Sequence, residues 1–473
     1  MKGVLSCQLN EEKMDIVFVQ IPLKGKTSSE PEERFFYQKY WNKFSEIVEE
    51  DLPSLPIYDI KELPLWIAAL GASVEKAGYS AQVVDLMGFN GSTIDYEGIE
   101  DELRKVDSSI FALSPFTNNY SVAVEVSKII KKIFGKKATV IFGGAHTSYT
   151  EDICLANESV DIVSKGEGDL ILPRIMKAIF NNQDLYDIPS ISWKKDGNII
   201  HNESNKDYIS ADDLPLPAYH LIPQTFRGAI PYGRIYTSRG CAYNCAYCAD
   251  TLYKRRKPIY QSIERSVKQA ELMRKYFGVN LIYVGDESFT YNEDYVRAFA
   301  EAMKERNFKW VSQTRADLVN EKILGIMKDG NCKLIKYGAE TANQHLLDLI
   351  RKGIKVEQVT KACEMAKDAG LSVLLYYMVG LPDESFETAE RTVSFAEDLF
   401  KRKLIDLVEY YITTPYPGTD LYQNPQRYNL EIIGKTFDDW REDQPSVTNT
   451  RFLTNVQIFD LWKSGLKRFG ELI

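Results

Sequence analysis

Residues 239–248 read Arg-Gly-Cys-Ala-Tyr-Asn-Cys-Ala-Tyr-Cys and place Cys241, Cys245 and Cys248 in the spacing C-x3-C-x2-C. Three thiolates at this spacing can hold three corners of a four-iron four-sulfur cluster. The fourth iron then has no protein ligand and is open to bind and activate a small molecule, whereas four ligands suit a cluster that only carries electrons. A zinc site is the alternative, but structural zinc prefers four ligands, and a fourth would have to come from a distant residue such as Cys332 or His345.

The cysteines follow the first strand of an alternating strand–helix series. We expect strands at 234–238, 281–285, 310–314, 333–338, 371–378 and 406–412, with helices around 261–277, 292–306, 319–329, 356–369 and 384–401. Six such units are too few for an eightfold barrel and suit an open, partial barrel, whose chemistry lies at the strand C-termini. The cysteines occupy that position.

The first half of the chain predicts a second α/β domain. Short apolar runs at 15–21, 82–86, 110–113, 139–142 and 160–163 alternate with helical patterns at 65–76, 122–133 and 168–180. Strands that alternate with helices indicate a doubly wound, Rossmann-like parallel sheet. Ligands of such sheets bind at the carboxyl ends of the strands, where this chain carries small and polar residues.

These patterns divide the chain into four parts. We expect the Rossmann-like domain at 1–187, a linker at 188–232, the partial barrel at 233–420, and a short helical segment at 421–473 that caps the barrel and contacts substrate. The linker contains a hairpin signal, Asp196-Gly197 between apolar pairs. A long connection at 22–64 includes a predicted helix at 37–50, which could serve as a lid or a partner surface.

Composition limits the class of protein. The chain has 473 residues, a net charge of −9 and seven cysteines. An odd number of cysteines is a poor disulfide framework, and the charge argues against non-specific nucleic-acid binding. The N-terminus lacks the apolar core of a signal peptide, and no apolar run is long enough to span a membrane. We therefore expect a cytoplasmic protein.

Several motifs together resemble the cobalamin-binding-domain class of radical S-adenosylmethionine (SAM) enzymes, over roughly residues 60 to 420. Beside the cysteine motif, the resemblance is carried by Gly285-Asp286-Glu287, Thr314-Arg315-Ala316-Asp317, Gly338-Ala339-Glu340-Thr341, Val379-Gly380-Leu381-Pro382-Asp383-Glu384 and Pro415-Tyr416-Pro417-Gly418-Thr419. In the first half it is carried by Leu63-Pro64-Leu65-Trp66, Phe142-Gly143-Gly144-Ala145-His146 and Gly166-Glu167-Gly168-Asp169.

The resemblance implies three cofactors and their sites. It implies a 4Fe-4S cluster on the three cysteines, and SAM bound by Tyr247, Asp286, Glu287, Arg315, Glu340 and Gly380. It implies cobalamin at Leu65, Trp66, Asp85, Ser114, Phe116, Gly143, Gly144, His146, Gly166, Glu167 and Gly168. No Asp-x-His-x-x-Gly motif marks a histidine below the cobalt, so His146 is expected to make a polar contact rather than to ligate the metal.

The implied activity is formation of a 5′-deoxyadenosyl radical and methylation of an unactivated carbon in a small-molecule or natural-product substrate, with flavodoxin or ferredoxin as electron donor. Alternatives are cyclisation or rearrangement without net methyl transfer, a radical SAM enzyme that has lost cobalamin, and a non-catalytic iron–sulfur carrier. Four tyrosines on the last two strands either pack in the core or line the substrate cavity: Tyr376, Tyr377, Tyr410 and Tyr411.

Overall fold

The computed structural model describes residues 13–23, 31–52, 63–91, 93–204, 209–249, 257–441 and 444–473. The first twelve residues, which bear on the signal-peptide expectation, lie outside that set. The chain divides into two compact units. The first comprises Met1–Gly25, Pro64–Asp207 and His220–Pro223, and the second comprises Lys26–Leu63, Tyr208–Tyr219 and Gln224–Ile473. Within the described ranges, no helix combines the length and the apolar character that crossing a bilayer requires.

The first unit is built on a seven-stranded sheet with the order β2-β1-β3-β4-β5-β6-β7. Its strands are β1 (Ile16–Gln20), β2 (Ala81–Asp85), β3 (Ile110–Leu113), β4 (Thr139–Phe142), β5 (Ile162–Ser164), β6 (Ile191–Lys195) and β7 (Asn198–His201). The first five strands are parallel. Apart from the edge strand β2, they are apolar and largely buried, as expected where helices cover both faces. The strand order reverses between β1 and β3, which is where doubly wound sheets bind ligands.

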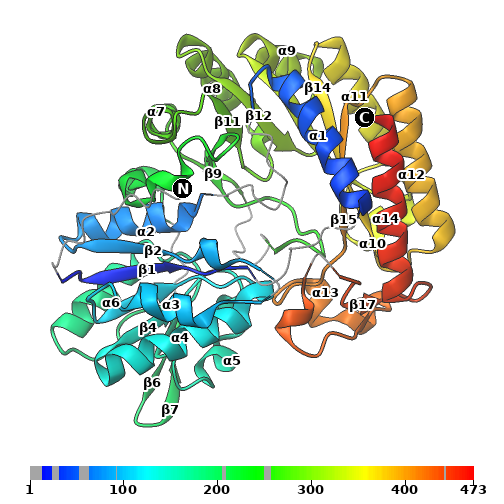
Figure 1. Ribbon diagram of the computed structural model, residues 1–473. Helices are drawn as coiled ribbons and strands as arrows, with labels where there is room; N and C mark the ends of the chain where they lie inside the picture. Colours follow the sequence, from blue (N-terminus) through cyan, green and yellow to red (C-terminus); the bar gives the residue numbers. More distant parts are fainter. Residues whose placement is uncertain are drawn as a thin grey trace, which may run out of the picture. The chain divides into compact units, whose positions relative to one another are not determined.

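Helices cover this sheet (Figure 1), three of them where the sequence predicted helices and two short ones, over 96–103 and 151–155, where it predicted none. They are α2 (Leu65–Lys76), α3 (Tyr96–Leu103), α4 (Tyr120–Phe134), α5 (Glu151–Leu155) and α6 (Ile171–Phe180). Helix α2 contacts α6, and α3 contacts α4. The alternation of strand and helix read from the sequence is thus confirmed as a Rossmann-like fold.

The hairpin predicted within the linker forms, but it extends the first sheet. Strand β6 pairs antiparallel with β5, with Trp193 opposite Ile162, and Asp196-Gly197 make the turn to β7. Both turn residues have positive φ, of 50° and 80°, as a two-residue hairpin of type I′ requires. The apolar side chains of Ile191 and Trp193 are buried. This burial is why the segment belongs to the sheet and not, as expected from sequence, to a linker at 188–232.

The second unit contains a six-stranded parallel sheet with the order β15-β14-β13-β12-β11-β8. The strands are β8 (Gly233–Ile235), β11 (Leu281–Val284), β12 (Lys309–Thr314), β13 (Cys332–Glu340), β14 (Ser372–Val379) and β15 (Leu407–Ile412). The connecting helices are α7 (Ile263–Phe277), α8 (Glu293–Glu305), α9 (Glu321–Asp329), α11 (Val356–Asp368) and α12 (Phe386–Lys401). Consecutive strands are neighbours throughout, so the predicted partial barrel is confirmed.

A helix from the long 22–64 connection belongs to the second unit. Helix α1 (Pro31–Val48) contacts β13, β15 and the last helix, α14 (Asn455–Leu472); Figure 1 shows α1 in blue beside α14 in red. Phe36, Tyr40, Phe44 and Val48 are buried at intervals of four, which places them on one face of the helix. The sequence analysis placed this helix in a first domain of residues 1–187. It belongs to the second unit instead, because its buried face packs on the barrel strands.

Candidate active site

The second unit holds a cavity of about 450 Å³ that all three motif cysteines line. The loop that carries them follows β8 and the short β9 (Ser238–Arg239). Two main-chain hydrogen bonds fix the loop: the Ala246 amide donates to Ile350 at 2.9 Å, and the Leu421 amide donates to Ala246 at 3.1 Å. The three predicted cluster ligands are therefore brought to one side of one cavity.

The thiols fit a cluster by their surroundings. Burial raises the pKa of Cys245, but Lys352 and Arg315 act against that rise. Cations beside thiols favour the thiolate form that binds iron. Among the described residues, no three His, Cys, Asp or Glu side chains converge closely enough to hold a single metal ion. The cysteines would hold the cluster, and the cavity in front of them leaves room for a ligand on the open iron.

Asp286 lies beside the cysteine loop but outside the cavity lining. Its carboxylate is 1% exposed and accepts hydrogen bonds from the amide and hydroxyl of Thr237 and from the Ser238 hydroxyl, each at 2.6 Å. These bonds tie the start of the cysteine loop to the end of β11. Its partners make Asp286 an anchor of the loop, and its predicted role toward SAM stays a prediction, while the adjacent Glu287 lines the cavity.

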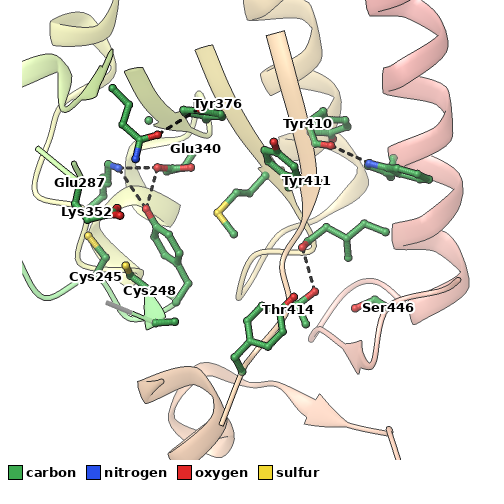
Figure 2. Close-up of a pocket in the computed structure, with 18 of the residues that line it drawn as sticks. Cys245, Cys248, Glu287, Glu340, Lys352, Tyr376, Tyr410, Tyr411, Thr414 and Ser446 are labelled. Carbon is green, nitrogen blue, oxygen red and sulfur yellow. Dashed lines mark hydrogen bonds and ion pairs between the residues drawn. The ribbon is translucent and has the colours of Figure 1, made fainter. Parts of the chain in front are cut away.

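Glu340 is held at the end of β13 by two partners. Its Oε1 accepts from the Tyr247 hydroxyl at 2.8 Å and from Lys352 Nζ at 2.6 Å, and all three residues line the cavity (Figure 2). Burial alone would lower the pKa of Lys352, but Glu340 and Cys245 outweigh it, so the pKa is raised and the ammonium stays charged. The ion pair presents one positive and one negative group beside the cysteines.

The backbone of Glu340 is strained. Its φ of 61° lies in the left-handed region, and the pairing of β13 with β14 shifts register between Gly338 and Glu340. Such a conformation costs on the order of 1–3 kcal/mol in a residue with a side chain, and it persists where surrounding contacts over-determine it. The bulge turns the carboxylate toward Tyr247 and Lys352, as expected of a site residue.

Arg315 also lines the cavity, but its guanidinium is already engaged. It pairs with Asp317 through two bonds of 2.9 and 3.0 Å and donates to the Lys352 carbonyl at 2.7 Å. Its flat face lies 3.6 Å from the ring centre of Tyr243, within the cysteine motif. These contacts make Arg315 a brace between the cysteine loop and Lys352.

Gly380, the last predicted SAM residue, does not line the cavity. Its φ is 80°, and an added Cβ would come within 2.9 Å of Ile458 on α14. The Gly380 amide donates to Glu384 Oε2 at 2.6 Å. Burial raises the pKa of Glu384 to about 8. Gly380 shapes the turn after β14, and its role toward SAM stays a prediction.

The predicted cobalamin residues gather at the carboxyl edge of the first sheet. Gly144 and Gly166 have φ of 96° and 73°, and a Cβ on Gly144 would meet Ser114 Oγ at 2.6 Å. Ser148 accepts from the Gly166 amide at 3.0 Å and donates to Gly144 at 2.8 Å. These hydrogen bonds join the loops after β4 and β5, and Ser114 of the loop after β3 lies close to Gly144. Phe116, which also follows β3, is 63% exposed. Small residues and an exposed ring at this edge fit a large planar cofactor.

Trp66 and Asp85 lie at the same edge. The Trp66 indole donates to Gln20 at the end of β1, at 3.1 Å, and packs edge-on against Phe18. Asp85 accepts from the Met87 amide at 3.0 Å after β2. Leu65, Gly143, Glu167 and Gly168 occupy the neighbouring loop and helix positions expected from the sequence.

His146 is buried rather than presented at this edge. It is 4% exposed, its Nδ1 lies 3.1 Å from the Thr117 hydroxyl, and its ring packs against Tyr120. Burial lowers its pKa to about 4, so the imidazole is neutral at pH 7. These contacts give His146 a structural role in the loop after β4, and its role toward cobalamin stays a prediction.

Sequence reasoning missed several cavity residues. Lys352 follows the short helix α10 (Gln344–Leu349), where no motif marks it. Glu33 and Tyr37 reach the cavity from α1. The opposite wall comes from β15, residues 440–441 and 444–447, and α14; beside Tyr411, which the sequence already offered as a cavity residue, its side chains include Ile412, Trp440, Gln444, Ser446 and Trp462. A helical pattern was visible for α1, but nothing local indicated that it would reach the barrel.

Comparison with known families places these two units. Residues 235–396 match the radical SAM superfamily, and residues 61–176 match the B12 binding domain. The chain is 30% identical over 373 residues to an uncharacterized methyltransferase of Pyrococcus horikoshii, covering 78% of this chain and 79% of that protein. The chain therefore belongs to the radical SAM family with a B12-binding domain, and it is a cobalamin-dependent radical SAM enzyme that uses a 4Fe-4S cluster, SAM and cobalamin.

More distant relatives differ in reaction. The chain is 22% identical to cytidylyl-2-hydroxyethylphosphonate methyltransferase of Streptomyces wedmorensis, over 83% of this chain and 82% of the relative. It is 25% identical to anaerobic magnesium-protoporphyrin IX monomethyl ester cyclase of Rubrivivax gelatinosus, over 76% and 66%.

Solved structures share the fold. The radical SAM methyltransferase TsrM from Kitasatospora setae, with cobalamin and a [4Fe-4S] cluster bound, superposes with a TM-score of 0.64 at 14% identity, covering 89% of this chain and 77% of TsrM. The cobalamin-dependent radical SAM enzyme OxsB has a TM-score of 0.65 at 18% identity, covering 88% of this chain and 56% of OxsB.

Proposed function

We propose that this enzyme transfers a methyl group to an unactivated carbon of a small organic molecule. The observation that carries the proposal is the division of one cavity into two walls. One wall holds the cysteines with Glu340 and Lys352, and the other is largely aromatic and apolar, with Tyr411, Ile412 and Trp440 among its members. Sites for small molecules are mostly apolar with a few convergent polar groups, and Gln313, Thr414, Gln444 and Ser446 supply those groups.

When bound, the cofactors supply a 5′-deoxyadenosyl radical and a transferable methyl group. The chain supplies orientation. Tyr247, Glu340 and Lys352 present a hydroxyl, a carboxylate and an ammonium beside the cysteines, which suits the amino and carboxylate ends of SAM. The aromatic wall holds the substrate carbon toward that site and excludes water, which would otherwise weaken every electrostatic contact inside.

Ring formation without net methyl transfer is the second candidate, because the Rubrivivax gelatinosus relative is a cyclase.

The deciding experiment uses SAM labelled with ¹³C and deuterium in its methyl group. Cluster-loaded, cobalamin-loaded protein is reduced with flavodoxin or ferredoxin and incubated with candidate small molecules. We expect 5′-deoxyadenosine together with a substrate product heavier by one labelled methyl group. A product that has lost hydrogen and carries no label would establish the cyclase reaction instead. A Cys245→Ala variant controls for label transfer that does not depend on the cluster.

A further inference from the structure

Tyrosines on the two faces of the barrel sheet differ in whether their hydroxyl group has a hydrogen-bond acceptor. Tyr376 on β14 and Tyr411 on β15 line the cavity, and Tyr283 on β11 lies next to Tyr376. Each has a hydrogen-bond acceptor: Tyr411 donates to Glu409 Oε2, and Gln313 Oε1 accepts from Tyr283 at 2.5 Å and from Tyr376 at 3.4 Å. The hydroxyl hydrogens of the inward tyrosines are thus directed into acceptors.

Neighbouring residues on the same strands point the other way, because successive side chains of a strand alternate between its faces. Tyr337, Tyr377 and Tyr410 are buried, and their phenolic oxygens have no hydrogen-bond partner among the described residues. Tyr410 borders the cavity, yet its side chain is 2% exposed and its ring packs against Phe469 of α14. Three buried tyrosines therefore lack a hydrogen-bond acceptor among the described residues. Burial alone does not explain why the inward tyrosines each have one.

The acceptor of Tyr411 is an ionised carboxylate. Glu409 accepts from the Tyr40 hydroxyl of α1 at 2.6 Å, and Lys336 Nζ lies 3.4 Å from the same oxygen. Burial alone would raise the pKa of Glu409, but Lys336 and the hydroxyls of Tyr40 and Tyr411 outweigh it and hold that pKa below its usual value. A charged acceptor binds a hydroxyl hydrogen about twice as strongly as a neutral one.

A phenol that faces a carbon radical can lose its hydroxyl hydrogen to that radical. The phenolic O–H bond is weaker than the methyl C–H bond of 5′-deoxyadenosine, so the 5′-deoxyadenosyl radical can take the hydrogen. A C–H bond then forms, the O–H bond breaks, and the tyrosine is left as a neutral phenoxyl radical without any change in the substrate. A hydrogen held by an acceptor must leave that acceptor first, which slows the transfer.

We propose that Glu409 is a positioning residue that withholds the Tyr411 hydroxyl hydrogen from the radical, so that the radical survives to reach the substrate. The proposal rests on the radical chemistry of the proposed function. Gln313 serves Tyr376 in the same way, over a longer contact. Tyr411 is 41% exposed, and Figure 2 shows it with Tyr376 on the strands that border the cavity. Its hydroxyl hydrogen is therefore the one most accessible to a radical in the cavity.

Deuterium tests the proposal without knowledge of the substrate. In D₂O the phenolic hydrogen exchanges, so a radical quenched by tyrosine gives 5′-deoxyadenosine with one carbon-bound deuterium. Cluster-loaded protein is reduced with dithionite, without thiols, and incubated with SAM alone. We expect Glu409→Gln to raise the deuterated fraction several-fold over the wild type and to yield a tyrosyl radical by electron paramagnetic resonance. The double variant Glu409→Gln/Tyr411→Phe should return to the wild-type fraction.

Two controls separate the outcomes. Tyr410→Phe, on the outward face, should leave the deuterated fraction unchanged, and cluster iron content shows that each variant is folded and loaded. A folded Glu409→Gln variant with wild-type deuteration would overturn the proposal, as would excess deuterium that persists in the double variant. Wild-type protein that forms no 5′-deoxyadenosine would instead overturn the proposed radical function, so the two failures are distinguishable.

Discussion

Lys352 Nζ lies 2.6 Å from Glu340 Oε1, and each of the two side chains is 8% exposed. The pair joins the end of β13 to the segment after α10. Tyr247 of the cysteine loop shares the same carboxylate oxygen. This buried contact therefore connects the cysteine loop, the end of β13 and the segment around Lys352, whose carbonyl accepts a hydrogen bond from Arg315.

Replacing Lys352 with Met should impair SAM binding. The change leaves a buried carboxylate without its cation, and breaking a buried pair in this way costs about 3–5 kcal/mol. We expect a lower denaturant midpoint and at least a tenfold weaker affinity for SAM, measured by calorimetry on cluster-loaded protein. Lys355→Met is the matched control, because Lys355 is exposed. Wild-type affinity in a folded Lys352→Met variant would show that the ion pair does not contact SAM.

Replacing Cys245 with Ala should abolish cluster assembly. The cavity then offers two thiols in place of three, and two cannot hold the cubane in place. Iron and sulfide analysis, together with the visible absorbance of the reconstituted protein, should show near-complete loss. Cys363→Ala is the control: this thiol is fully buried and outside the cavity, and burial raises its pKa to about 12. Equal iron loss in both variants would point to misfolding instead.

Replacing Phe36 with Ala should destabilise the second unit. Phe36 is 0% exposed on the face of α1 that packs on the barrel, and a Phe-to-Ala change in a core costs about 3–5 kcal/mol. Hydrogen exchange should rise in α1 and in β15. Phe35→Ala, at a position 40% exposed on the same helix, should cost much less. Increased exchange confined to the first unit would contradict the assignment of α1.

His146 should make the first unit less stable in mild acid. Its pKa is about 4 in the folded protein against an ordinary value of 6.5. Between these values the unfolded chain binds a proton that the folded chain does not, so stability falls as pH is lowered from about 6.5 toward 4 and levels off below that. Between pH 7 and pH 5 this amounts to roughly 2 kcal/mol.

His146→Gln provides the comparison for that effect, because an amide does not titrate. Denaturant unfolding at pH 7 and pH 5 should show a smaller loss of stability for the variant than for the wild type. The difference between the two proteins isolates His146 from Glu384, whose raised pKa acts with the opposite sign. Identical pH dependence in the two proteins would mean that His146 is protonated as readily in the fold as outside it.

Local sequence patterns predicted the strands of both sheets and the longer helices, because each of these elements carries its own periodicity, but they missed the short helices α3, α5 and α10. They could not predict which of the two units an element belongs to. Helix α1 and the β6–β7 hairpin are the two examples: both were visible as elements, but their partners, α14 and β5, lie elsewhere in the sequence. Assignment of an element to a unit depends on these long-range contacts.

The site shows a similar limit at the level of single residues. Motif position indicated both Asp286 and Glu287, yet adjacent side chains diverge, and Asp286 turned toward Thr237 and Ser238. Lys352 was missed because it carries no motif and reaches the site only through tertiary packing. The three cysteines line one cavity, as expected from a spacing that places them on one compact loop, and their role as cluster ligands stays a prediction.

The pairing of α1 with α14 has a consequence for biosynthesis. The ribosome makes α1 before most of the Rossmann-like unit, and it makes α14 after the last barrel strand. The apolar face of α1 therefore has no partner to pack against until synthesis is nearly complete. Contacts so distant in sequence slow folding, and apolar surface that waits exposed is prone to aggregation. Phe36 and Phe44, which are buried in the folded protein, are therefore without their barrel contacts until the barrel is complete.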